Sequence, residues 1–184
     1  MSGSNLMLTI CALLLFGLFA MGGRTLTATN SRIADHSEYS LTAISVAQSI
    51  IDEAKTKAFD HRTTNRWFSV PPDSFSTALG PDISSEIFTM ADTSSSGAYR
   101  SATKYNDIDD YNHYVRVINS NRARGYVVSV EVNYVNESDP ESLTSSRTNC
   151  KRMDVSVTCP AMSQLNAETS EDALPIRLSY VFAY

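Results

Sequence analysis

Residues 6–21 read LMLTICALLLFGLFAM, a stretch in which Thr9 is the one clearly polar side chain. No Asp, Glu, Lys or Arg occurs before Arg24. As an α-helix the stretch would be about 24 Å long, slightly less than the hydrocarbon core of a bilayer at about 30 Å, and its neutral flanks can extend it. We therefore expect residues 1–23 to form an apolar helix segment that lies in a membrane or in the core of a filament.

A secretory signal peptide is the main alternative for this segment. Ala20, Met21 and Gly22 place small residues where a signal peptidase prefers them, but no Lys or Arg precedes the apolar stretch. Arg24 and Arg32 follow it, and by the positive-inside rule they favour a cytoplasmic C-terminal part. A basic leader upstream of residue 1 would reverse that orientation.

Residues 24–60 contain neither proline nor glycine. Apolar or small residues recur every three or four positions, the spacing of one helix face, at Ile33, Ser37, Leu41, Ile44, Ala47, Ile51, Ala54 and Ala58. The pattern predicts an amphipathic continuation of the same helix, ending near Asp60 and His61.

Three glycines interrupt the apolar segment, at Gly17, Gly22 and Gly23. Each weakens a helix by about 1 kcal/mol relative to alanine. They are interpreted either as residues that a lipid environment tolerates, or as a point of flexibility at which the helix can melt and stretch.

Residues 61–184 predict a β-rich globular head. The strongest strand signal is 125–135, GYVVSVEVNYV, in which apolar and polar residues alternate. Further strands are expected at 113–118, with Val115 and Val117 inward, at 152–158 and at 176–182, and shorter ones near 67–70 and 86–90. Residues 136–140 and 163–172 are expected to be loops. One apolar face and one polar face indicate an antiparallel sheet covered on one side, and the amphipathic helix is the natural cover. The predicted fold is therefore α+β, a long N-terminal helix packed on an antiparallel sheet.

This order of elements resembles type IV pilins and secretion pseudopilins. Residues 41–60 are similar to the region that follows the anchor in minor pilins, and 107–111, 125–135, 151–158 and 175–184 are similar to the head sheet of mannose-sensitive-haemagglutinin-type minor pilins. The chain departs from the family pattern in three ways. Gly3 is followed by Ser4 and not by phenylalanine, position five is Asn5 and not an acid, and the first acid is Asp35.

The resemblance implies a structural subunit of a cell-surface filament or secretion pseudopilus on a bacterium, anchored in the membrane before assembly. Its partners would be copies of itself and other pilin-like subunits. The contacts would come from large apolar side chains of the first helix segment, namely Leu6, Leu8, Ile10, Leu13, Leu14, Leu15, Phe16, Leu18 and Phe19. Two alternatives stay open: a single-pass anchored accessory subunit of an envelope complex, with a periplasmic head as docking module, and a secreted adhesin.

Composition and the absence of known motifs argue against several other classes of protein. The 184 residues carry 15 Lys and Arg against 20 Asp and Glu, a net charge of −5, which argues against a nucleic-acid binder. A hydrophobic share of 42% argues against disorder. No nucleophile elbow, P-loop or dinucleotide motif is present, so an enzyme is not expected. His36, His61 and His113 lie far apart in sequence and do not predict a zinc site.

The densest acidic group is Asp107, Asp109 and Asp110. Oxygen ligands at alternate positions suit calcium, although the group lacks the glycine and the distal glutamate of an EF-hand. The alternative is a solvated, turn-forming loop.

Cysteine occurs at Cys11 in the apolar segment and at Cys150 and Cys159, which bracket a predicted strand. An extended strand would hold the last two about 30 Å apart, too far for a mutual disulfide. They are expected to be free thiols, or one of them links to a neighbouring subunit.

Overall fold

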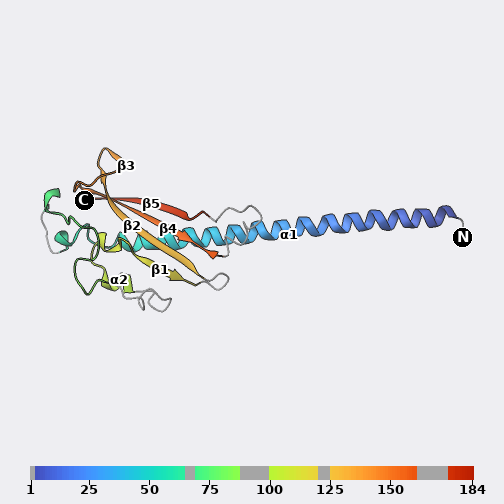
Figure 1. The fold of residues 1–184 in the computed structure, drawn as a ribbon, viewed down its shortest axis with the longest axis horizontal. Helices are drawn as coiled ribbons and strands as arrows, with labels where there is room; N and C mark the ends of the chain where they lie inside the picture. The colour runs from blue at the N-terminus through green and yellow to red at the C-terminus, as the bar shows by residue number, and fades with distance from the viewer. Residues whose placement is uncertain (1–2, 65–68, 88–99, 120–124, 161–173) are drawn as a thin grey trace. The chain divides into compact units, whose positions relative to one another are not determined.

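The computed structural model describes residues 3–64, 69–87, 100–119, 125–160 and 174–184 (Figure 1). The chain divides into two compact units, residues 1–38 and residues 39–184. Helix α1, Gly3–Ala54, begins in the first unit and ends in the second. The long N-terminal helix and the α+β class predicted from the sequence are confirmed.

Helix α1 ends six residues earlier than the sequence pattern predicts, at Ala54 instead of near Asp60. Ala58 leaves the helix to form an isolated parallel bridge with Asp107. In that bridge the Ala58 amide donates to the Asn106 carbonyl at 3.1 Å, and the Ile108 amide donates to the Ala58 carbonyl at 3.0 Å. A pairing partner distant in sequence thus ends the helix, and neither proline nor glycine marks the place.

Among the described residues of the second unit, five strands form one antiparallel sheet. They are β1 (Val115–Ile118), β2 (Tyr126–Asn136), β3 (Asp139–Leu143), β4 (Cys150–Thr158) and β5 (Ile176–Ala183). The order across the sheet is β1-β2-β4-β5, and β3 pairs with the end of β2. Short helical turns connect the remaining described parts: η1 (His61–Thr63), η2 (Pro72–Ser74), α2 (Arg100–Lys104) and η4 (Asp109–Tyr111).

The alternation predicted for the two longest strands is confirmed. Tyr126, Val128, Val130, Val132 and Tyr134 of β2 are all buried. In β4 the buried apolar residues are Met153, Val155 and Val157. Because Val130 pairs with Val155 and Val132 with Met153, the two rows lie side by side on the same face.

The prediction that Val115 and Val117 of β1 face the core is wrong. Val115 is 44% exposed, and it pairs with Ser129 on the polar face of the sheet. Arg116 pairs with Val128 instead and so lies on the covered face. The chain enters β1 through His113, whose φ of 62° turns the backbone and shifts the alternation by one residue.

Strand β3 begins at Asp139, where a loop was predicted. The sequence indicated a loop because Asp139 and Pro140 are poor strand formers. Of the short strands expected near 67–70 and 86–90, residues 67, 68 and 88–90 lie outside the described residues, and the described remainder is not in strands. The loop expected at 163–172 also lies outside the described residues.

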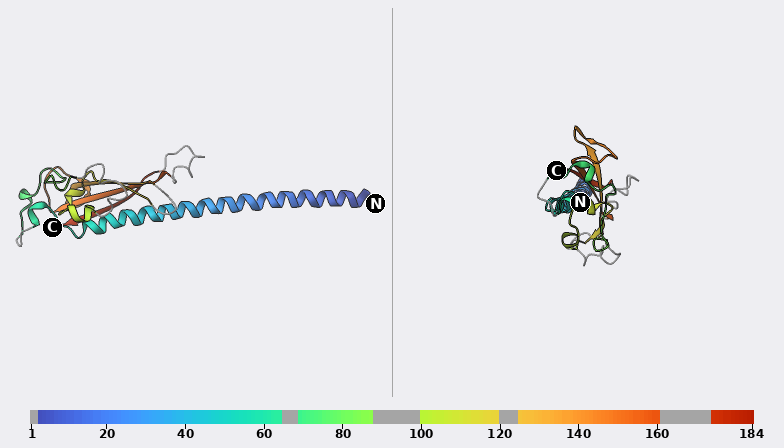
Figure 2. Two further views of the ribbon diagram at one scale, coloured as in Figure 1. Left: turned by 90° about the horizontal axis from the view of Figure 1, so that it is seen from below. Right: turned by 90° about the vertical axis from the view of Figure 1, so that its left-hand side faces the viewer.

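Helix α1 packs on the covered face of the sheet through its C-terminal part (Figure 2). Its buried residues are Ala43, Ala47, Ile50, Ile51 and Ala54. Leu41 and Ile44, expected on this face, are 67% and 42% exposed. The buried face is therefore formed by three alanines and two isoleucines.

This packing makes Ala47 sensitive to size. Replacing Ala47, which is fully buried, with leucine should lower the free energy of unfolding by about 1–3 kcal/mol, because added atoms would overpack the helix–sheet contact. Ser45→Leu on the exposed side of the same helix is the matched control and should change stability little. Denaturant unfolding of both variants in detergent measures the difference. Equal stability of A47L and the parent chain would contradict this packing.

Candidate functional site

The apolar segment of α1 is exposed along its length. The nine side chains expected to mediate assembly are between 49% and 82% exposed. By length and composition this helix is able to cross a membrane, with a mean hydropathy of 2.3 over its most apolar window. A membrane anchor fits the segment. Gly17, Gly22 and Gly23 all lie inside the unbroken helix, so their role as a flexible point stays a prediction.

Exposed apolar side chains continue beyond the uncharged segment. Leu26, Ile33, Leu41 and Ile44 are 68%, 60%, 67% and 42% exposed. At about 100° per residue, these four positions fall within about 80° of the helix circumference. They form an apolar stripe that continues toward the buried face of the same helix.

In the head, a lysine ammonium is buried at the centre of a polar network. Lys151 Nζ donates to Asp109 Oδ1 at 2.8 Å, to Asp60 Oδ2 at 3.1 Å and to the Phe59 carbonyl at 2.8 Å. All three charged side chains are fully buried. The Nζ atom also lies 4.7 Å from the ring centroid of Phe59 and 5.3 Å from that of Tyr134.

Asp60 is held by several donors at once. Its carboxylate accepts the Arg62 amide at 3.0 Å, which caps η1, and the Ser76 amide at 2.9 Å. Burial alone would raise the pKa of Asp60, but the Lys151 ammonium and these amides outweigh burial and hold the pKa below its usual value. Asp60 is therefore the ionised partner of Lys151.

The solvated loop expected at Asp107, Asp109 and Asp110 is wrong, because these residues are 1%, 0% and 1% exposed. The turn itself is present as η4. Asp110 Oδ2 accepts the Asn106 amide, and Asp107 Oδ1 accepts the Asp110 amide. The ammonium of Lys151 supplies to Asp109 the positive charge that calcium would supply. A calcium site formed by the three aspartates stays a prediction.

Burial raises the pKa of all three aspartates in this cluster. It raises the pKa of Asp107 to about 9, with Asp109 and Asp110 adding to the effect. Burial also raises the pKa of Asp109, although Lys151 lowers it, and raises the pKa of Asp110 to about 6 against the amides that lower it. At neutral pH Asp107 is therefore a protonated acid.

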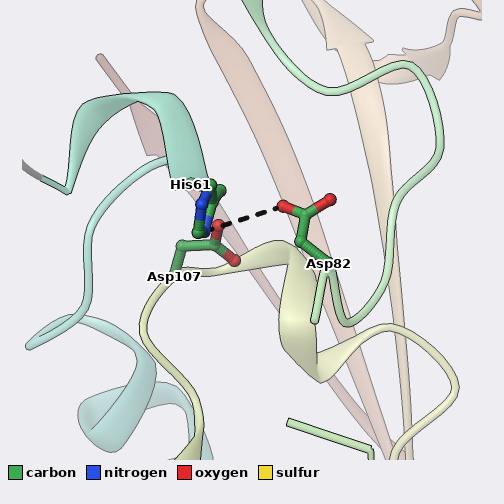
Figure 3. Close-up of side chains that lie close together, drawn as sticks. All are labelled: His61, Asp82 and Asp107. Atoms are coloured by element: carbon green, nitrogen blue, oxygen red, sulfur yellow. Dashed lines mark ion pairs between the residues drawn. The ribbon is translucent and has the colours of Figure 1, made fainter. Parts of the chain in front are cut away.

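Asp107 of this cluster lies close to His61 and Asp82. His61 in η1, Asp82 and Asp107 each offer a ligand atom, and these atoms lie within 4.8 Å of one another (Figure 3). His61 Nδ1 lies 4.0 Å from Asp82 Oδ2. The sequence gives no sign of this group, because its members come from three segments with no common spacing.

The two cysteines of the head are not paired with each other. Cys159 is 2% exposed, so a neighbouring subunit cannot reach its sulfur in the folded head, whereas Cys150 is half-buried. Cys11 is exposed on α1.

Comparison of the chain with protein-family models, with curated proteins and with solved structures found no significant match.

The network around Lys151 should be essential to the stability of the head. Lys151→Met leaves Asp60 and Asp109 buried without their cation, which should cost about 3–5 kcal/mol of unfolding free energy. Lys55→Met is the control, because the pair of Lys55 and Asp52 is exposed and should contribute little to stability. Denaturant unfolding compares them, and similar losses in both variants would contradict the role of burial.

Stability should fall as the pH rises from about 4 to about 9. Since Asp107 binds its proton more tightly in the folded chain, its contribution is complete below the unfolded pKa of about 3.9 and is lost as the pH passes through about 9. Asp107→Asn mimics the protonated acid and should flatten this slope, with a melting temperature about 2–4 °C above the parent chain at pH 8. Thermal unfolding at pH 5 and pH 8 with a chelator present measures this. Parent stability that rises over that interval would contradict the assignment.

Proposed function

We propose that this protein is a structural pilin-like subunit, anchored in a membrane by α1 and assembled with copies of itself, through the same helix, into a cell-surface filament or secretion pseudopilus. The observation that carries the proposal is the exposed apolar surface of α1. It runs from Leu6 to Ile44, well past the uncharged segment.

The length of this surface favours assembly over simple anchoring. A bilayer core of about 30 Å is spanned by about 20 helical residues. From Leu26 to Ile44 the helix rises by about a further 27 Å. A lone anchor has no use for an apolar stripe on that part. Helix-to-helix packing between copies would bury both regions, the first on all sides and the second along its stripe.

The packing of α1 against the sheet of the head supports the same proposal. The C-terminal part of α1 covers the apolar face of an antiparallel sheet, so one helix carries both the core of the head and the surface that would join copies. This is the architecture that the resemblance to minor pilins implies. The accessory-subunit alternative keeps the anchor and the head but removes the contacts between copies, and the experiment below separates the two.

Self-association can be tested by disulfide trapping in membranes that carry the full chain. With Cys150→Ser and Cys159→Ala in the background, and Cys11→Ala added where the probe lies elsewhere, single cysteines are placed in turn at 11, 12, 13 and 14, which sample the whole circumference of a helix. After oxidation, at least one position should give a covalent dimer on a non-reducing gel. No dimer at any of the four, with the protein still in the membrane, would favour the lone-anchor alternative.

The stripe is tested in the same assay. Ile33→Asp places a charge on it and should reduce the dimer yield about fivefold, equivalent to about 1 kcal/mol. Ser31→Asp lies on the opposite side of the helix and is the matched control. Both variants should stay in the membrane fraction, and equal yields from the two would rule out the stripe as the contact.

A further inference from the structure

The head buries more negative charge than it neutralises. Among the described residues, five carboxyl groups are at most 2% exposed, and one ammonium, that of Lys151, is buried with them. If every carboxyl were ionised, these five acids and one base would leave an excess of four negative charges. The buried acids are Asp60, Glu86, Asp107, Asp109 and Asp110. Buried charges in proteins are normally paired or bind metal ions.

Some of these oxygens have no hydrogen-bond donor. Asp107 Oδ1 accepts the Asp110 amide, but Asp107 Oδ2 has no partner among the described residues. The side-chain oxygen of Asn106, the preceding residue, is also buried and unpartnered. An unpartnered carboxylate oxygen on a residue only 1% exposed is costly unless a proton or a cation occupies its lone pairs.

The carboxylate of Asp107 lies beside the imidazole of His61, with the carboxylate of Asp82 facing both (Figure 3). The three come from η1, the turn before residue 86 and the segment bridged to Ala58. A hollow of about 570 Å³ is lined by His61 and Asp82, together with Arg62 and Arg147. Two of the three ligand residues can therefore be reached from solvent.

We propose that His61, Asp82 and Asp107 bind one divalent transition-metal ion, of which Zn²⁺ is the best match. An imidazole nitrogen with two carboxylate oxygens is a donor set that zinc takes, whereas calcium prefers oxygen alone. Water from the hollow completes the coordination.

The fit requires only a small movement. Ligands of a tetrahedral zinc with bonds of about 2.0–2.1 Å lie about 3.3 Å apart. His61 Nδ1 and Asp82 Oδ2 are 4.0 Å apart, and their side chains are 39% and 31% exposed, so both are free to close by that amount. All three ligand atoms lie within 4.8 Å of one another, so His61 and Asp82 would also have to close toward the buried Asp107.

A second set of contacts holds the ligands in place. Glu86 Oε2 accepts the amides of Asp82 at 3.1 Å and Ile83 at 3.0 Å, which fixes the turn that carries Asp82. Glu86 Oε1 accepts the side-chain amide of Asn106, the neighbour of Asp107. Glu86 thus ties two ligand segments to each other, as the outer groups of metal sites do.

The bound ion would act as a clamp within the head. It would join η1, the turn at residue 82 and the bridged segment at residue 107, and it would supply the missing positive charge to the acidic cluster. Binding to the folded chain alone raises thermal stability by mass action.

The test uses the full chain in detergent, stripped of metal and titrated with Zn²⁺ alone. Calorimetry should show one bound ion per chain. At a concentration of about 100 times the dissociation constant, the melting temperature of the head should rise by about 5–10 °C. His61→Gln and Asp82→Asn should each weaken binding at least about tenfold without lowering the metal-free melting temperature, since both side chains are partly exposed.

His113→Asn is the matched control, because it removes an exposed histidine whose positive φ asparagine accepts well. It should bind Zn²⁺ as the parent chain does. Absence of any Zn²⁺-dependent shift would overturn the proposal. So would equal binding by H61Q and the parent chain, or stabilisation by Ca²⁺ that survives H61Q, since that result would assign the ion to the aspartates alone.

Discussion

The packing of the last three turns of α1 against the covered face of the sheet is the contact on which the head depends. Alanines at 43, 47 and 54 belong to the same buried cluster as the inward-facing valines of β2 and β4. The same helix carries a large exposed apolar surface in its earlier part. Its C-terminal region buries apolar area within its own head, and in the proposed assembly its N-terminal region would do so against lipid or copies of the chain.

A sheet with one helix on one face leaves a gap where that helix ends, and the polar network fills it. Past Ala54 the chain turns, and Lys151 reaches from β4 into the space between Phe59 and η4. Beyond the end of α1, the described core contains one ammonium, five buried carboxyl groups and three tyrosines in place of aliphatic side chains. The tyrosines, Tyr105, Tyr111 and Tyr114, pack edge to face. Buried charge of this kind is costly when incomplete, which explains why protons or a cation are needed there.

Much of the fold was predictable because period and composition agree over long stretches. Residues 128–134 alternate between apolar and polar, and no charge or proline interrupts the first helical turns of the chain. Two of the errors come from features that the local pattern does not contain. The bridge of Ala58 to Asp107 ended α1 early, and the positive φ at His113 precedes a strand β1 whose Val115 lies on the polar face of the sheet.

The candidate site was predictable only in part, for the same reason. The cluster at 107–110 was visible as a run of acids, but its burial follows from Lys151, which reads in the sequence as an ordinary polar position before a strand. Nothing in the spacing of His61, Asp82 and Asp107 joins them. The apolar character of the first part of α1, by contrast, can be read directly from residues 6–21, which contain one clearly polar side chain.

The contacts of Lys151 also bear on the order of events in folding. Its partners Phe59, Asp60 and Asp109 lie 92, 91 and 42 positions away in sequence. An ammonium stays hydrated until its carboxylates are in place, because desolvation without them is too costly. Helix α1 can form early from local contacts, but the head closes only after β4 has been synthesised and docked. During translation, the apolar segment is thus available to a membrane or a partner long before the domain that it carries is complete.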